Sequence, residues 1–330
     1  MSEPVLLAVD GGNSKTDVAL VREDGSVLSL VRGQGSSPHQ LGLSRAVRVV
    51  ADLVDRAWFE ARPEQRDGHR ALAAAVFMAG ADLPEEEAAL ADAIRGQNWA
   101  DATMVANDVH ALLWAATGRG DGVAVTVGAG VNCVGRSPDG RTAWFPALGP
   151  ITGDWGGGHE LGLAALGAGV RAEDLRGPAT TLAAAVAAAF GRDTSLDVAV
   201  AVHQGTLHRD RLMELAPLVV REARRGDEVA LAIVHRQADE VTALALAALR
   251  QLLLLDRPVD IVLGGSVLAA MGDLVLDRIR DGITAEAAGA RVTLCTTRPV
   301  MGAAVAAMHL AGLDGSAVAH VQLELGGDDE

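Results

Sequence analysis

The chain has 330 residues, enough for two domains, and 49% of them are hydrophobic, so a sizeable interior can form and global disorder is excluded. Its formal net charge of −15 argues against general binding to nucleic-acid backbones, which requires a basic surface. The apolar stretches are too short to span a membrane, the start does not resemble a secretory signal, and the two cysteines form no CxxC pair. We therefore expect a cytoplasmic protein that binds neither membranes nor nucleic acid.

The first part of the chain predicts an α/β layer. Val5–Asp10 is a short apolar run that leads into Asp-Gly-Gly, as expected of a buried strand that enters a tight turn. A strand, a hairpin turn and a return strand follow, after which strands and helices alternate. The predicted strands are 16–22, 27–32, 71–79 and 103–106, and the predicted helices are 43–61, 84–95 and 109–116.

The pattern restarts near residue 119. The second part predicts strands over 123–127, 131–135 and 142–145, a helix-rich stretch over about 158–256, a strand over 259–263, a helix near 267–280, a strand near 291–295 and a helix near 302–312. Each half opens with an apolar strand, a Gly-rich turn and a strand pair, which predicts a duplicated plan. We place one domain at 1–118, with the helix near 302–312 packing back on it, a second domain at 119–301, and a loose tail at 313–330.

The first Gly-rich turn, residues 10–16, reads Asp-Gly-Gly-Asn-Ser-Lys-Thr. Its glycines allow close approach of the backbone to an anion, and its Asn, Ser and Thr carry hydrogen-bond donors. Lys15 is the only lysine of the chain, and a compact ammonium fits beside a phosphate. Asp10 could hold Mg²⁺ through water, because this ion prefers oxygen ligands. A plain hairpin turn is the alternative interpretation, since Asp-Gly is a strong turn former.

Two further Gly-rich turns stand in the second half. Gly128-Ala129-Gly130 lies between two predicted strands, which does not suit a dinucleotide fingerprint but suits a hairpin that grips a phosphate. Gly264-Gly265-Ser266 lies between a strand and a helix, where small residues let a flat base approach the backbone. A sheet bend and an ordinary tight turn are the respective alternatives.

Acidic side chains near strand ends and in flexible loops are the candidates for chemistry. Asp108 follows a predicted strand and could accept a proton from a substrate hydroxyl, although Asp is also an ordinary helix N-cap. Asp154 lies in the Gly-rich loop 153–158 and could accept hydrogen bonds from a polyol. His39 lies in a polar loop and either touches a substrate or is solvated.

Together, the three turns in this order, with an Asp after the strand between the first two, resemble the BadF/BadG/BcrA/BcrD ATPase family and, within it, the N-acetylglucosamine kinases. The likeness covers about residues 5–312 and is strongest at 10–16, 79–82, 107–108, 128–133, 153–154 and 264–267. It implies a two-lobed, ribonuclease H-like α/β fold (the actin-like ATPase, or ASKHA, fold) with mixed central sheets and a hinge. It also implies ATP and Mg²⁺ as cofactors and transfer of the γ-phosphoryl group to the primary (6-) hydroxyl of a small-molecule amino sugar.

The resemblance further implies individual site residues. Asp108 would be the general base, and Asp10 would lie near the magnesium ion. The implied ATP-binding residues are Gly11, Gly12, Asn13, Ser14, Lys15, Thr16, Gly128, Ala129, Gly130, Gly264, Gly265 and Ser266. The implied substrate-binding residues are Ser37, His39, Asn107, Asp108, Asn132, Gly149 and Asp154.

The sequence departs from the family pattern at three places. Ala129 and Val131 remove the two hydroxyls of the usual Gly-Thr-Gly-Ser turn, Ser37 and Pro38 stand near an expected Asn, and Trp155 replaces a Glu. These changes leave open a glucosamine kinase, or another sugar kinase of the same fold. They also leave open a sensor of sugar or nucleotide that does not catalyse.

Two other possibilities follow from the wider family. An activator ATPase of a radical dehydratase requires an iron–sulfur cluster held by cysteines, and Cys133 and Cys295 do not supply the expected pair. Folds of this kind often form homodimers, but the sequence identifies no interface.

Overall fold

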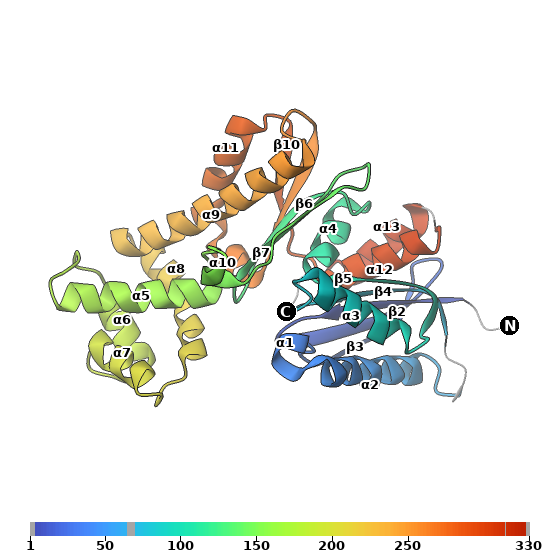
Figure 1. The fold of residues 1–330 in the computed structure, drawn as a ribbon, viewed down its shortest axis with the longest axis horizontal. Coiled ribbons are helices and arrows are strands. Elements are labelled where there is room, and N and C mark those ends of the chain that lie inside the picture. Colours follow the sequence, from blue (N-terminus) through green and yellow to red (C-terminus); the bar gives the residue numbers. More distant parts are fainter. Residues whose placement is uncertain (1–3, 65–69, 314, 328–330) are drawn as a thin grey trace. The chain divides into compact units, whose positions relative to one another are not determined.

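The computed structural model describes residues 4–64, 70–313 and 315–327, which divide into two compact units (Figure 1). The first unit takes its described residues from 1–124, 134–142 and 295–330, and the second from 125–133 and 143–294. The chain crosses between the units four times, within the strands at 122–127, 131–136 and 142–144 and directly after the strand at 290–294. The sequence suggested boundaries after residues 118 and 301. Hydrophobic patterning marks strands, and it carries no signal for the point along a strand at which contacts change partner.

A five-stranded mixed sheet is the centre of the first unit. Its order is β3-β2-β1-β4-β5, formed by β1 (Val5–Gly11), β2 (Lys15–Arg22), β3 (Val27–Gln34), β4 (Ala71–Met78) and β5 (Ala100–Asn107). The pairs β1–β2 and β2–β3 are antiparallel, and the pairs β1–β4 and β4–β5 are parallel. The central strands are covered on both faces, which explains their nearly continuous apolar sequences.

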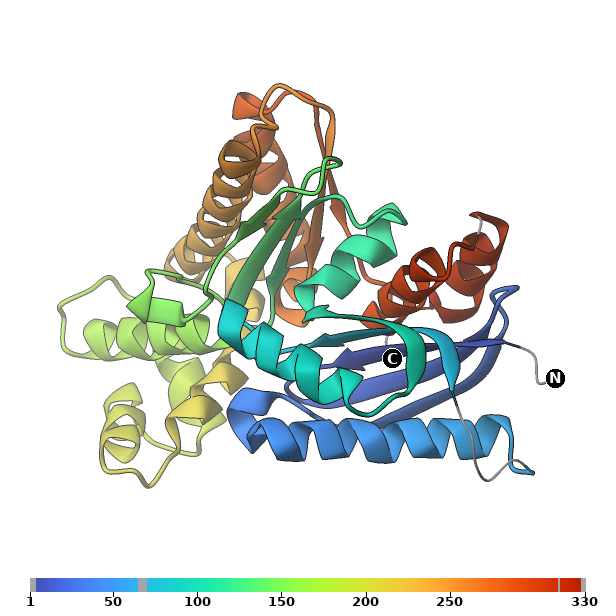
Figure 2. The same ribbon diagram turned by 45° about the vertical axis from the view of Figure 1, so that its right-hand side comes forward.

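Helices cover both faces of this sheet (Figure 2). Because side chains alternate along a strand, Leu7 and Val9 of β1 join one core, and Leu6 and Ala8 join the other. The first core is closed by α2 (Leu43–Ala61) and α3 (Pro84–Arg95), with the short α1 (Pro38–Leu41) before α2. The second core is closed by α4 (Val109–Thr117), α12 (Pro299–Leu310) and α13 (Gly315–Leu325).

Helix α13 corrects the predicted loose tail over 313–330. Ala317, Val321 and Leu325 are buried at helical spacing in the second core. The carboxylate of Glu324 accepts a hydrogen bond from the backbone N–H of Val27 at 3.1 Å, which ties the helix to the hairpin of β2 and β3. Three apolar residues one turn apart are a weak signal, and the polar end of the chain obscured it. Residues 314 and 328–330 lie outside the described residues.

The second sheet repeats the plan of the first. Its order is β10-β9-β6-β7-β8, formed by β6 (Gly122–Val127), β7 (Val131–Arg136), β8 (Thr142–Trp144), β9 (Val259–Gly264) and β10 (Ala290–Leu294). Counted in chain order within each sheet, the strands of both follow the sequence third, second, first, fourth, fifth. The predicted duplication and the α/β fold class are therefore confirmed.

The helix-rich stretch of the second unit begins after η1 (Gly149–Ile151). It contains α5 (Gly157–Glu173), α6 (Leu182–Ala189), α7 (Ser195–His203), η2 (Arg209–Leu215), α8 (Ala216–Arg224) and α9 (Glu228–Leu252). The single helix predicted near 267–280 is instead α10 (Ser266–Met271), η3 (Gly272–Leu274) and α11 (Leu276–Glu286), because Gly272 adopts a positive φ of 41° that interrupts the helix. Within the described residues, no helix is both long and apolar enough to cross a membrane.

Candidate functional site

The first Gly-rich turn joins β1 to β2. The N–H of Gly12 donates to the Lys15 carbonyl at 2.9 Å and closes the turn, and the N–H of Ser36 donates to the Gly12 carbonyl at 3.1 Å. The chain after β3 crosses so closely that a Cβ on Gly35 would lie 2.1 Å from the Asn13 carbonyl oxygen. Asn13 and Ser14 remain exposed at the tip, where they are accessible to a ligand.

Thr16 has a structural contact that the sequence did not reveal. Its side chain is fully buried, and its hydroxyl donates to the Ser36 hydroxyl at 2.8 Å. A Cβ on Gly11 would lie 2.6 Å from that same Ser36 oxygen. The hydroxyl of Thr16, which we predicted to bind ATP, thus already has a buried partner, whereas Asn13 and Ser14 keep exposed donors.

Asp10 has a buried carboxylate whose negative charge is only partly balanced by nearby positive charges. The residue is 6% exposed, and burial, with smaller contributions from the carboxylates of Asp108 and Asp17, raises its pKa to about 8. Lys15 and Arg32 lower the pKa, but less strongly. A divalent cation beside Asp10 would favour the ionised form, and Mg²⁺ is commonly held by one or two carboxylates together with substrate phosphates. The carboxylate of Asp10 is therefore a suitable oxygen ligand for the predicted magnesium ion.

The neighbouring charges are divided between structure and ligand binding. Arg32 donates to both carboxylate oxygens of Asp17, at 2.7 and 2.8 Å, and Asp17 is 2% exposed, so this pair is part of the framework. Burial, followed by the positive charge of Arg32, lowers the pKa of Lys15. The negative charge of a phosphate would offset the repulsion between Arg32 and the Lys15 ammonium and so favour the charged form of Lys15. This suits Lys15 to nucleotide binding.

Replacing Asp10 with Asn should stabilise the ligand-free protein increasingly as the pH rises. The pKa of Asp10 is raised in the folded state, so its contribution to stability is fully present below the unfolded value of about 4 and is lost as the pH rises through about 8. The Asp10→Asn variant lacks this loss. The melting temperature of the variant minus that of the natural chain should therefore grow from acidic to mildly alkaline pH. Each kcal/mol of unfolding free energy gained should raise this difference by roughly 2–4 °C.

Asp101→Asn is the matched control for this measurement. Asp101 is exposed on β5 and pairs with Arg70 at 2.6 Å, so its replacement should not produce a gain that grows with pH. A difference in melting temperature for Asp10→Asn that stays constant across the pH range would contradict the assigned environment of Asp10.

Asp108 lies between β5 and α4 and is not an ordinary helix cap. It makes no side-chain capping hydrogen bond, and Asn107 takes that role by accepting from the Val109 N–H at 3.0 Å. Burial, with a smaller contribution from the Asp82 carboxylate, raises the pKa of Asp108 to about 7, although the nearby N–H groups of Val109 and Asp108 act in the opposite direction. A carboxyl with this pKa suits proton transfer near neutral pH.

A polar network surrounds Asp108. Asn107 donates from Nδ2 to Asp82 at 2.7 Å, so its amide links the N-terminus of α4 to the loop after β4. His39 lies between two acids, with Nε2 2.9 Å from Glu86 Oε1 and Nδ1 3.7 Å from Asp82 Oδ2. Glu86 also accepts from the backbone N–H of Asp82 and thereby shapes the same loop. The sequence analysis did not assign site roles to Asp82 and Glu86.

Ser37 adds a polar group to this side of the first unit. Its side chain is 1% exposed, and its hydroxyl has no hydrogen-bond partner among the residues that the structure describes. Gly80 has a positive φ of 76°, and a Cβ there would lie 2.8 Å from the Ser37 hydroxyl and 3.2 Å from the His39 ring. The first unit thus gathers the predicted residues Ser37, His39, Asn107 and Asp108.

In the second unit, the turn Gly128-Ala129-Gly130 contacts the N-terminus of α5. The N–H of Gly158 donates to the Gly128 carbonyl at 2.8 Å, and the N–H of His159 donates to the Ala129 carbonyl at 3.0 Å. Gly157 has a φ of 78°, and a Cβ there would lie 2.4 Å from Gly130 Cα. Only glycine at residue 157 fits this approach, so the turn and the helix start form one structural element.

Gln237 supports that element from α9. Its side chain is fully buried, and its Oε1 accepts from the Gly157 N–H at 2.8 Å. A Cβ on Gly156 would lie 2.5 Å from the Gln237 amide nitrogen, so a glycine is also required there. A lone Gln within a long amphipathic helix carries no sequence signal of such a role.

The third turn contacts the second. Gly265 has a φ of 94°, and a Cβ there would lie 2.3 Å from the Val127 carbonyl oxygen, immediately before Gly128. Ser266 is exposed at the start of α10. The second unit therefore brings together two of the three Gly-rich turns predicted to bind ATP.

The residues predicted to bind sugar in the second unit lie in two places. Gly149 and Asp154 are joined, because the Asp154 N–H donates to the Gly149 carbonyl at 3.0 Å. The Asp154 carboxylate accepts from the Thr152 hydroxyl at 2.5 Å. Asn132 lies on β7, and its Oδ1 accepts from the Cys133 N–H at 2.7 Å.

Comparison with known proteins identifies the family. The BadF/BadG/BcrA/BcrD ATPase family matches residues 7–307. The chain belongs to this family. An N-acetylmuramic acid/N-acetylglucosamine kinase of Clostridium acetobutylicum is 25% identical over 263 residues, which cover 80% of this chain and 85% of the relative. An N-acetyl-D-glucosamine kinase of Dictyostelium discoideum is 22% identical over 321 residues, which cover 94% and 99%.

Solved structures confirm the predicted fold of this family member. A Chromobacterium violaceum protein, provisionally assigned as an N-acetylglucosamine kinase, has a TM-score of 0.72 at 24% identity, and the match covers 94% of this chain and 100% of that one. The BadF-type chain thus has the two-sheet, actin-like ATPase fold that its sequence suggested.

Cys133 of this BadF-type chain lies in the surroundings expected of a core residue. Cys133 is fully buried on β7, its Sγ lies 3.8 Å from the Leu244 carbonyl oxygen, and burial raises its thiol pKa. A buried thiol with a raised pKa is neutral at physiological pH, whereas iron–sulfur clusters are bound by thiolates. Cys133 therefore acts as a small apolar residue of the core.

Proposed function

We propose that this member of the BadF/BadG/BcrA/BcrD ATPase family is an ATP-dependent sugar kinase that phosphorylates the 6-hydroxyl of N-acetylglucosamine or a related amino sugar. The environment of Asp108 carries the proposal, because its carboxyl does not cap α4 and has a pKa of about 7. The Clostridium acetobutylicum and Dictyostelium discoideum relatives are named as amino-sugar kinases, which supports an amino sugar as the acceptor.

In the proposed reaction, Asp108 accepts the proton of the sugar hydroxyl. The hydroxyl oxygen forms a bond to the γ-phosphorus of ATP, the bond between this phosphorus and the bridging oxygen breaks, and ADP leaves with that oxygen. A base with a pKa near the working pH combines a sufficient unprotonated fraction with sufficient basicity. Asn107 positions the loop by capping α4 and binding Asp82.

The Gly-rich turns within each unit supply the proposed nucleotide-binding groups. Lys15 supplies a positive charge, and exposed Asn13 and Ser14 supply polar groups, for the β- and γ-phosphates. The N–H of Gly128 donates within the turn to the Gly130 carbonyl at 2.9 Å, so the backbone N–H groups of Ala129 and Gly130 replace the hydroxyls that Ala129 and Val131 lack in this proposal. The small residues Gly264 and Gly265 would border the adenosine, and Asp10 would hold Mg²⁺, which would supply positive charge beside the phosphates.

Each unit offers polar groups for the proposed sugar substrate. The buried Ser37 hydroxyl lacks a partner among the described residues, which suits it to a hydrogen bond with a sugar hydroxyl. Asp154 and Asn132 offer oxygen acceptors for other hydroxyls, and Asp154 is held by its contact with Gly149.

A coupled ADP-release assay with Mg²⁺-ATP and a panel of sugars tests the function. The panel contains N-acetylglucosamine, N-acetylmuramic acid, glucosamine and glucose, and mass spectrometry identifies the phosphorylated product. ADP release that depends on an amino sugar is the expected result. Sugar binding without ADP release from any member would instead indicate a sensor, and iron in the purified protein would indicate an activator ATPase.

The rate should rise with pH through the pKa of Asp108. Below about pH 7 the carboxyl is protonated and cannot accept the hydroxyl proton, so kcat/KM should fall by about tenfold per pH unit. Above this value kcat/KM should level off. The measurement is kcat/KM for the preferred sugar at saturating Mg²⁺-ATP, and a flat profile between about pH 5 and pH 8 would contradict the assignment of the base.

A further inference from the structure

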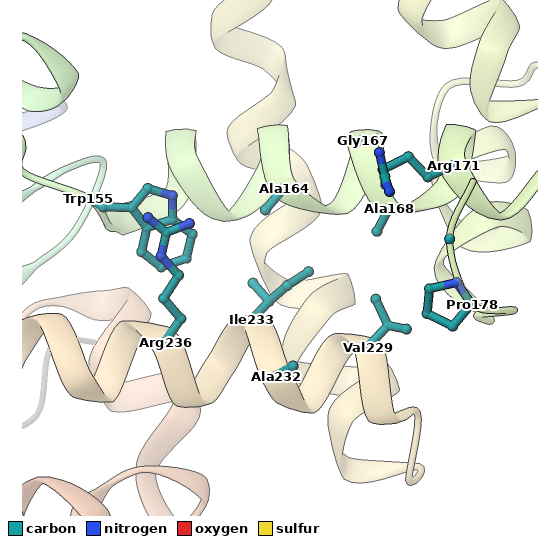
Figure 3. Close-up of a pocket in the computed structure, with 11 residues that line it drawn as sticks. Trp155, Ala164, Gly167, Ala168, Arg171, Pro178, Val229, Ala232, Ile233 and Arg236 are labelled. Atoms are coloured by element: carbon teal, nitrogen blue, oxygen red, sulfur yellow. The ribbon is translucent and has the colours of Figure 1, made fainter.

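A groove of about 420 Å³ lies between α5 and α9 in the second unit (Figure 3). Its walls are apolar: α5 contributes Ala164 and Ala168, α9 contributes Val229 and Ile233, and Pro178 stands in the loop before α6. Sites for small molecules typically enclose about 300–1,000 Å³ and are mostly apolar with a few polar groups. The groove has the size and composition of such a site.

The charged groups that line the groove are Arg236 and Arg171. Figure 3 shows Arg236 over the ring of Trp155 at one end, where its guanidinium carbon is 4.0 Å from the ring centroid. Arg171 lies toward the other end, and its Nη2 donates to the Arg176 carbonyl at 2.7 Å. Among the lining residues within the described ranges, none is acidic.

Two acidic groups outside the lining partly offset the charge of these arginines. Glu240 Oε1 forms an ion pair with Arg236 Nε at 3.8 Å, a distance too long for a hydrogen bond. Asp174 pairs with Arg176 at 2.7 Å and also interacts electrostatically with Arg171. Since the whole chain carries a formal charge of −15, a lining with two arginines favours an anionic ligand at this place over a neutral or cationic one.

We propose that this groove is a second ligand site, for a small organic carboxylate with an apolar tail or ring. The carboxylate pairs with Arg236, whose planar guanidinium suits bidentate recognition, and the apolar part lies between α5 and α9. From Ala164 to Arg171 the α5 wall extends about 10 Å, at 1.5 Å per residue, which accommodates a medium-length chain.

The groove is joined to the Gly-rich element through consecutive residues of α9. Arg236 stacks on Trp155, and Gln237 accepts from the N–H of Gly157. A ligand that draws Arg236 away from Trp155 therefore acts on the loop that precedes α5. Through Gly158, this loop is bonded to the 128–130 turn, so occupancy of the groove should change the apparent affinity for ATP.

Fluorescence titration of the full chain with anilinonaphthalene sulfonate, an organic anion with an apolar body, tests the proposal. The titration is performed in saturating Mg²⁺-ATP, and octanoate and the neutral octanol are then used as competitors. We expect one saturable site from which octanoate displaces the probe far better than octanol does. Binding is read without any phosphoryl transfer, so the result does not depend on the proposed kinase activity.

Two groove variants and one control locate the site. Arg236→Gln removes the charge at similar length and should raise the dissociation constant of octanoate by about tenfold or more. Ala232→Trp fills the groove from α9 and should abolish displaceable binding. Arg56→Gln, on α2 of the first unit, removes an exposed arginine paired with Glu60 and should bind as the natural chain does. Thermal melting checks that each variant is folded.

Several outcomes would overturn the proposal. Unchanged octanoate binding in both groove variants would place the probe elsewhere. Equal competition by octanol would remove the role of the arginine. A dimer of the natural chain that Ala232→Trp converts to a monomer, without any anion binding, would show that a second copy of the chain covers the groove.

Discussion

The Asp108→Asn variant should lose about 10²- to 10⁴-fold in kcat, because it keeps the shape of the side chain and removes the proton acceptor. Nucleotide binding should persist, since neither the Gly-rich turns nor Lys15 is altered. The Asp108 carboxylate raises the pKa of Asp10, so the variant should also lower that pKa and favour the ionised form beside Mg²⁺. Steady-state kinetics and calorimetric titration with Mg²⁺-ATP measure the two effects separately.

Asp101→Asn is the control on the same strand. Its carboxylate is exposed and paired with Arg70, so kcat should remain close to that of the natural chain. Full turnover by Asp108→Asn with the preferred sugar would exclude this carboxyl as the base. Equal loss of turnover and of ATP binding would point to a structural role.

The Gly157→Ala variant should raise the KM for ATP by about 10- to 100-fold, because a misplacement of about 1 Å in a positioned site has effects of this size. The added Cβ would lie 2.4 Å from Gly130 Cα. Because Gly130 Cα is a backbone atom and no side-chain rotation can relieve the clash, the 128–130 turn must move. The positive φ of 78° adds a strain of order 1–3 kcal/mol to the folded state. Kinetics and thermal melting report the two consequences.

Gly205→Ala separates the clash from the backbone strain. Gly205 has a similar φ of 73° between α7 and η2, but a Cβ there would meet no atom within 4 Å. This control should lose stability through φ alone and keep the KM for ATP. If the two variants had the same KM, close packing of Gly157 against Gly130 would have no part in nucleotide binding.

Sequence patterning located most elements because their signals are local. Helices α2 and α3 begin and end at the predicted residues, since each combines an amphipathic stretch with clear boundaries. The three Gly-rich turns and Asp108 were found because each follows an apolar strand. The sequence did not predict the break at Gly272 or the helix at 315–325. A glycine within a helical stretch and three spaced apolar residues are ambiguous signals until the residues that pack against them in space are known.

The site shows the same division. The residue types in the turns at 10–16, 128–130 and 264–266 follow from the chain alone, and so does their likeness to one ATPase family. The supporting contacts arise between segments far apart in the chain, such as Gln237 with Gly157 and Ser36 with Thr16. A pKa of about 7 for Asp108 likewise depends on burial and on Asp82, which come together only when β4 and β5 pair. The sequence therefore determines which chemical groups each turn carries, whereas burial and contacts between distant segments exist only after the chain has folded.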